Sequence, residues 1–152
     1  DLTLRLVGME KVFPCTIVPA TLPRSKSDFV VAVLFGDRSC AGLTFSAKGQ
    51  TFEGVRELLN VHKGAVLANL SDFQTLTYEN GPTRTRSRLP FRDHGHRQNF
   101  FHSHAGLREG GSPGESLFET AATARFFLAV REAVESGKTV VVTREEIEKL
   151  IS

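Results

Sequence analysis

The pattern of apolar and polar residues between Lys11 and Arg88 is that of short strands. From Asp28 to Phe35 the chain is almost continuously apolar, and it then reaches Gly36-Asp37, a pair typical of turns. From Ser39 to Ser46, small polar residues alternate with apolar ones. This alternation predicts a strand with one apolar and one small polar face. Together the two segments predict a hairpin.

Further short strands are predicted in two more hairpins. They cover Glu57 to His62, Ala65 to Asn69, Phe73 to Tyr78, and Arg84 to Leu89. Lys63-Gly64 joins the first pair, and a turn containing Asn80-Gly81 joins the second. Asn-Gly supplies the positive φ angles that a tight hairpin needs. Because no helical crossover separates these hairpins, they predict a largely antiparallel sheet.

The segment before the first hairpin is less regular. Asp1 to Val7 looks like the last two turns of a helix, with Gly8 in the position of its C-terminal cap. Val12 to Val18 is rich in strand-forming residues. Pro14 and Pro19 predict that this strand is irregular or lies at the edge of its sheet.

Helical patterns follow Pro90. His96 to Arg108 places Phe100, His104 and Leu107 on one side of a helix. Ser116 is a good N-cap, and Glu119 three residues later completes the capping-box signature.

The helix that starts at Ser116 is predicted to run to Ser136 and to end at Gly137. Its apolar face is predicted from residues at helical spacing. They are Leu117, Ala121, Ala124, Leu128 and Arg131, widened by Phe126, Phe127 and Val130. Thr139 to Val142 then predicts a short strand, and Thr143 caps a last helix that runs to Ile151.

Strands followed by helices predict the fold class. We expect one α+β domain over residues 1–152, with helices packed on one face of a largely antiparallel open sheet. A chain of 152 residues, of which 40% are hydrophobic, is expected to have one core.

Composition narrows the classes of partner. Nineteen Lys and Arg against 17 Asp and Glu leave a net charge of +2, so we expect no polyanion partner and no nucleic acid. No apolar run approaches the roughly 18 residues of a membrane span, and no signal segment opens the chain. Two cysteines are too few for a disulfide scaffold, so a reducing, cytoplasmic compartment is expected. The only Met is Met9, and the start at Asp1 leads us to expect an excised piece of a longer protein.

The histidines are the most conspicuous candidates for chemistry. They are His62, His94, His96, His102 and His104. Residues two apart on a helix point about 200° apart, so His102 and His104 would not share one metal ion. We therefore expect no metal site.

The arginines form a basic stretch made of Arg84, Arg86, Arg88, Arg92 and Arg97, with the first three on one face of a strand. A nucleic-acid surface would add exposed aromatic residues. Because Phe91 and Phe100 are predicted to be core residues, a solvated face is the favoured interpretation.

No complete catalytic or cofactor-binding set can be assembled from the residues. Cys15 and Cys40 lie in strands without a CxxC partner, and we expect both to be small core residues. Ser39, Ser46 and Ser71 lack the context of a nucleophile elbow, and residues 110–114 do not form a phosphate-binding loop.

The order of the short motifs resembles the C-terminal domain of the glucose–fructose oxidoreductase, inositol dehydrogenase and rhizopine-catabolism family (Gfo/Idh/MocA). The motifs are the hairpin from Asp28 to Ser39, Leu43 to Gly49, Val61-His62-Lys63-Gly64, Leu70-Ser71-Asp72-Phe73, Asp93-His94-Gly95-His96, and the helices around Gly110-Gly111. Arg38, Ser71 and His94 depart from the family pattern and suggest a divergent member.

The resemblance implies a specific role. Family members have an N-terminal Rossmann domain that binds NAD or NADP, and a C-terminal α+β domain that helps wall the substrate pocket. This chain matches the second part, so it is expected to contain no cofactor-binding or catalytic residues and to be inactive alone. The parent would be an NAD(P)-dependent oxidoreductase acting on a small molecule such as a sugar or polyol. The alternative is a non-enzymatic interaction module that kept the fold without the chemistry.

A final expectation concerns the sheet face that the helices leave open. It would carry Cys40, Gly42, Thr44 and Ser46, with Thr75, Thr77, Arg84, Arg86 and Arg88 as further candidates. In the family this face commonly packs against another subunit. We therefore expect a homo-oligomer formed sheet to sheet.

Overall fold

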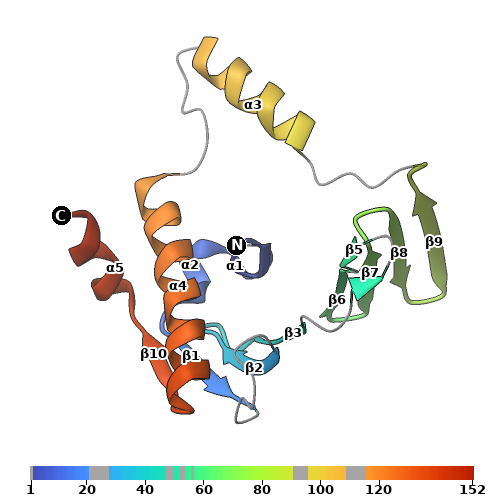
Figure 1. Cartoon of the computed structure of the whole chain (residues 1–152). Coiled ribbons are helices and arrows are strands. Elements are labelled where there is room, and N and C mark those ends of the chain that lie inside the picture. Colours follow the sequence, from blue (N-terminus) through green and yellow to red (C-terminus); the bar gives the residue numbers. More distant parts are fainter. Residues whose placement is uncertain are drawn as a thin grey trace. The chain divides into compact units, whose positions relative to one another are not determined.

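The computed structural model describes residues 2–20, 28–46, 50–51, 54–55, 57–90, 96–108 and 116–152. The chain divides into two compact units, the first made of residues 1–48 and 114–152 and the second of residues 49–113. Both units contain helix and strand (Figure 1), and every described strand pair is antiparallel. The α+β fold class is confirmed.

The first unit contains a four-stranded sheet in the order β10-β1-β2-β3. Its strands are β1 (Cys15–Pro19), β2 (Asp28–Leu34), β3 (Cys40–Ser46) and β10 (Val140–Val142). The predicted hairpin is formed by β2 and β3, with Val31 opposite Leu43 and Val33 opposite Ala41. In its turn, the Asp37 carboxylate accepts a hydrogen bond from the Ser39 N–H at 2.9 Å.

The prediction that the first strand lies at an edge is wrong. β1 is a central strand, paired with β10 on one side and with β2 on the other. Pro14 precedes the strand, and Pro19 is its last residue. The pairs with β10 involve only Cys15 to Ile17, so neither proline interrupts that ladder.

The described helices of the first unit are α1 (Leu2–Val7), α2 (Met9–Val12), α4 (Leu117–Ser136) and α5 (Arg144–Ile151). As predicted, α1 is followed by Gly8, whose φ is 96° and whose N–H donates to the Leu4 carbonyl. The capping box of Ser116 and Glu119 is present at the start of α4, and Gly137 ends this helix in the left-handed conformation. The sequence analysis did not predict the short helix α2.

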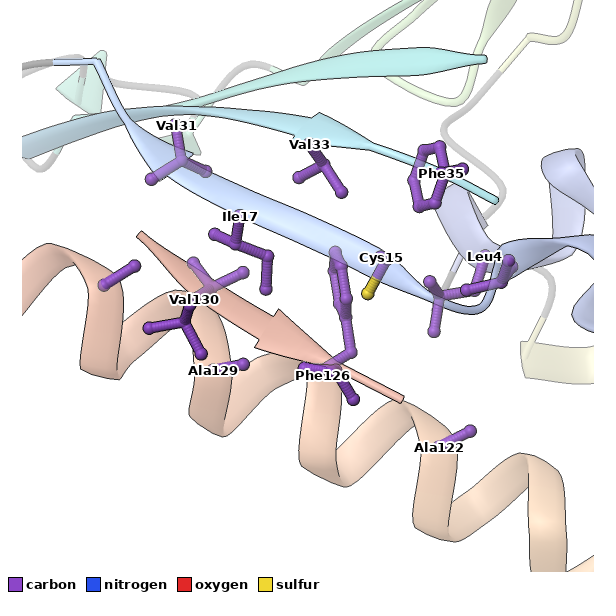
Figure 2. Packing of buried hydrophobic residues seen from close by; sticks show 14 of the residues in the cluster. Leu4, Cys15, Ile17, Val31, Val33, Phe35, Ala122, Phe126, Ala129 and Val130 are labelled. Atoms are coloured by element: carbon purple, nitrogen blue, oxygen red, sulfur yellow. The ribbon is translucent and has the colours of Figure 1, made fainter. Parts of the chain in front are cut away.

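Helix α4 covers one face of this sheet, and the side chains of the core lie between them (Figure 2). The buried residues of α4 are Ala122, Phe126, Ala129, Val130, Ala133 and Val134. The predicted apolar face is confirmed only in part, because Phe126 and Val130 are buried, whereas Leu117, Phe127 and Leu128 are exposed. The buried stripe combines three alanines with the larger Phe126, Val130 and Val134 at helical spacing, and this is the face that α4 turns toward the sheet.

The second unit contains a four-stranded meander in the order β6-β7-β8-β9. Its elements are β4 (Gln50–Thr51), β5 (Gly54–Val55), β6 (Leu58–Lys63), β7 (Val66–Ser71), β8 (Thr75–Asn80), β9 (Thr83–Arg88) and α3 (His96–Arg108). The predicted hairpins of this unit and the helix α3 are confirmed, whereas the short pair β4 and β5 was not predicted. Gly64 and Gly81 supply positive φ angles of 60° and 56° at the two predicted turns.

The described strands thus form two four-stranded sheets and the two-stranded pair β4–β5, whereas a single sheet was expected from the sequence. Every buried hydrophobic residue in the described part of the chain belongs to the first unit. Among the described residues, no helix is both long and apolar enough to cross a membrane.

Candidate functional site

The sheet of the first unit has one face covered by α4 and a second face that we call the open face. The strand register assigns its residues. They are Thr16 and Val18 from β1, Asp28, Val30, Ala32 and Leu34 from β2, Cys40, Gly42, Thr44 and Ser46 from β3, and Val141 from β10. The small polar side predicted for β3 is therefore confirmed as part of this face.

Apolar and small residues meet on the open face. Leu34 and Val141 are each 51% exposed, and both lie opposite Thr16 in the register. Gly42 is opposite Ala32, and a methyl group added at Gly42 would meet no atom within 4 Å. Small side chains on a flat sheet are suited to packing against another sheet.

Leu34 and Val141 were not predicted to be members of this face. The apolar run of β2 shows no alternation that would separate its inner residues from its outer ones. The position of Val141 depends on the pairing of β10 with β1, which joins segments far apart in the chain. This pairing cannot be predicted from the residues near Val141 in the sequence.

The two cysteines have different environments, although both were predicted to be core residues. Cys15 is buried, and burial raises the pKa of its thiol to about 11, despite a backbone hydrogen bond from Val142 and the nearby charge of Arg125. Cys40 is exposed on the open face, so the prediction for this residue is wrong. The Cys15 thiol is thus in a poor environment for a nucleophile.

The sheet of the second unit has a polar face, which we call the arginine face. Its register gives three rows across the four strands. They are Leu58–Ser71–Thr75–Arg88, Asn60–Asn69–Thr77–Arg86 and His62–Leu67–Glu79–Arg84. The predicted alignment of the three arginines, together with Thr75 and Thr77, is confirmed. These residues belong to a different sheet from Cys40 and Thr44, so the single combined face expected from the sequence is wrong.

Two polar contacts order the side chains on the arginine face. Arg84 Nε lies 3.1 Å from Glu79 Oε1, in the cross-strand pair that these residues form. The Asn69 side-chain amide donates to the Asn60 side-chain oxygen. The neighbouring residues Arg86 and Arg88 are also exposed.

The histidines are distributed over separate elements. His62 lies on β6, whereas His102 and His104 lie on α3, where the His104 ring stacks on Phe100 with centroids 6.3 Å apart. In the described part of the chain, no group of three His, Cys, Asp or Glu side chains is arranged to hold a metal ion. Two of the sequence candidates, His94 and Arg92, lie outside the described residues.

Phe100 was predicted to be a core residue, and this is wrong because 67% of it is exposed. The adjacent Phe101 is also exposed, at 55%, and packs edge-on against it. Phe91, the other aromatic residue assigned to the core, lies outside the described residues.

The described junction between a strand and a helix does not fit a Rossmann-type dinucleotide site. Such a site has a glycine-rich turn between a strand and a helix N-terminus. The junction between β10 and α5 has Thr143 in that place, and its hydroxyl accepts from the Glu146 N–H. The predicted loop at residues 110–114 lies outside the described residues. The hydroxyl of Ser46 donates to Asp28 at 2.6 Å, which is a structural contact on the open face.

Comparisons with protein-family models, with curated proteins and with solved structures find no match to this chain.

Proposed function

We propose that this chain is an assembly domain whose open face packs against the same face of a second copy. The observation that carries the proposal is the exposure of Leu34 and Val141 on a sheet face whose opposite side is covered by α4. Antiparallel sheets commonly have one packed and one solvated face, and the solvated face is then usually polar. Here the second face contains exposed aliphatic and small residues instead.

The chemistry of the open face supports a self-complementary contact. Its one carboxylate, Asp28, accepts a hydrogen bond from Ser46 within the same face. A two-fold contact brings each residue of a patch near its own copy or its symmetry mate, so a face without a row of like charges is suited to it.

For the parent protein we propose an NAD(P)-dependent oxidoreductase that acts on a sugar, polyol or related hydroxyl compound in the cytoplasm. The support is the resemblance of the ordered motifs to the Gfo/Idh/MocA C-terminal domain, together with an α+β fold of the expected class. NAD or NADP would bind to a Rossmann domain of the family type. The residues of this chain would contribute assembly and a wall of the substrate pocket.

Sedimentation equilibrium at tens of micromolar tests the assembly. We expect a concentration-dependent dimer for the wild type and a monomer for Thr44→Arg, because Thr44 is exposed on the open face, opposite Val30. Ala124→Arg is the matched control, since Ala124 is exposed on α4 and an arginine there should leave the dimer intact. A wild-type monomer at all concentrations would contradict the proposal, as would a Thr44→Arg dimer of unchanged affinity.

The cofactor assignment has its own test. Titration calorimetry with NADH should show no binding to this chain, because the resemblance assigns the cofactor to a separate Rossmann domain. Micromolar affinity for NADH would contradict the proposal that another domain of the parent protein binds the cofactor.

A further inference from the structure

The strand β9 ends the sheet of the second unit. It is the last strand in the order β6-β7-β8-β9, and no other strand pairs with its outer edge in the described part of the chain. All six of its residues, Thr83 to Arg88, are exposed. An edge of this kind presents backbone N–H and C=O groups that another chain can bind.

The turn before β9 determines which backbone groups face outward. Asn80 lies opposite Thr83 across the two-residue turn Gly81-Pro82, and the φ of 56° at Gly81 suits a type II′ turn. The pair that closes such a turn is hydrogen-bonded, and bonded and non-bonded pairs alternate from there along an antiparallel ladder. The Leu89 N–H donates to the Gln74 carbonyl at 2.9 Å, which confirms that odd-numbered residues bond toward β8.

The even-numbered residues of β9 are Arg84, Arg86 and Arg88, so their N–H and C=O groups face the outer edge. Their side chains all lie on the arginine face. Residues two apart in a strand are spaced by about 6.8 Å. The edge therefore offers backbone hydrogen-bonding groups and a positive charge at every second residue.

We propose that the outer edge of β9 binds an extended acidic peptide as an additional strand. In an antiparallel pairing, the residues directly opposite the arginines would exchange backbone hydrogen bonds with them. Carboxylates at those alternate positions would face the guanidinium groups on the same side of the sheet. The Arg84–Glu79 pair, at 3.1 Å between β9 and β8, already shows this contact on the inner side of the strand.

Two other occupants fit the edge less well. A second copy of β9 would set arginines opposite arginines, and like charges in such pairs are destabilising. Single-stranded RNA would need aromatic rings on the arginine face for its bases to stack on. The register places Tyr78, opposite Thr85, on the other face of the sheet.

The test is a fluorescence anisotropy titration of the full chain with a labelled peptide, Thr-Glu-Val-Glu-Val-Glu-Thr. A peptide of the same composition but blocked order, Glu-Glu-Glu-Val-Val-Thr-Thr, is the matched probe. We expect the alternating peptide to bind roughly tenfold more tightly, because only its carboxylates can match the arginines in register. N-methylation of its glutamates should abolish binding, whereas N-methylation of its valines should not.

Protein variants test the same contact. Arg86→Glu should weaken binding of the alternating peptide by roughly tenfold or more, through loss of one pair and a new repulsion. Thr85→Glu adds a carboxylate on the opposite face of the same strand and is expected to have little effect. Circular dichroism of both variants checks that the sheet is retained.

Three results would overturn the proposal. Equal affinity for the blocked and alternating peptides would mean unspecific charge attraction. Tighter binding of a labelled oligouridylate than of the peptide would identify a nucleic-acid surface. Absence of binding by every probe would mean that the arginines only protect an exposed edge from aggregation.

Discussion

The substitution Gly36→Ala tests the packing between the β2–β3 turn and the start of the first unit. The Gly36 N–H donates to the Val12 carbonyl at 3.2 Å. A Cβ atom at Gly36 would lie 2.5 Å from the Phe13 carbonyl oxygen, 2.9 Å from the Phe13 carbonyl carbon and 3.1 Å from the Lys11 oxygen. All three neighbours are backbone atoms, so the turn itself would have to move.

We expect Gly36→Ala to lower the free energy of unfolding by about 1–3 kcal/mol, the usual cost of forcing an extra carbon into a packed site. Part of this loss is offset, because replacing glycine restricts the unfolded chain and contributes about 0.4–1 kcal/mol in the other direction. Gly42→Ala, measured at a concentration at which the chain is monomeric, is the matched control, since no atom of the chain lies within 4 Å of its added carbon. The control should be neutral or slightly stabilising.

Urea unfolding followed by circular dichroism measures both variants against the wild type, each fitted with a common slope. A midpoint for Gly36→Ala at or above that of Gly42→Ala would refute the close approach of the turn to Phe13. A lower midpoint with an unchanged slope would support it, because the change would then lie in the native packing.

Two further predictions concern the cysteines and the cap of α4. Iodoacetamide at pH 8 should label Cys40 and leave Cys15 unmodified until denaturant is added, because Cys15 is buried and the pKa of its thiol is raised to about 11. Mass spectrometry of the digested protein measures the labelling of each cysteine. Labelling of Cys15 in the folded protein would contradict the prediction. Ser116→Ala should lower the free energy of unfolding by about 0.5–2 kcal/mol at neutral pH. Hydrogen bonds from the Ser116 backbone and hydroxyl lower the pKa of Glu119 in the folded protein. The contribution of Glu119 to stability is therefore present above its pKa in the unfolded chain, and it is lost as the pH falls through its pKa in the folded protein. In Glu119→Gln, the free energy of unfolding should therefore fall less steeply toward acidic pH than in the wild type. An unchanged pH dependence would contradict the role given to Glu119.

The elements with strong local signals could be predicted from the sequence. The capping box at Ser116, the left-handed Gly137 and the turn at Gly81 each depend on a few adjacent residues. The alternation in β3 likewise identifies its apolar and polar faces. These features are local, and the structure confirms each of them.

The errors arose where residues distant in the sequence decide the outcome. The central position of β1 depends on its pairing with β10, although its prolines suggested an edge. The buried stripe of α4 depends on which side of the helix faces the sheet, and that side contains Phe126 and Ala129 but not Leu128. Cys40 is exposed because α4 covers the other side of the sheet, and its place in the alternation with Gly42 and Thr44 is a better guide to its exposure than its residue type.

The division of the strands into two sheets also separates the arginines from the face proposed for assembly. A single face that combined Thr44 with Arg84, Arg86 and Arg88 would repel its own copy. The structure assigns the arginines to the sheet of the second unit, and the open face of the first unit contains none. An arginine row is suited to an acidic partner, whereas a face of small and aliphatic residues without a row of like charges is suited to a copy of itself. The two surfaces can therefore bind different partners, and Thr44→Arg and Arg86→Glu should each affect only one of the two interactions.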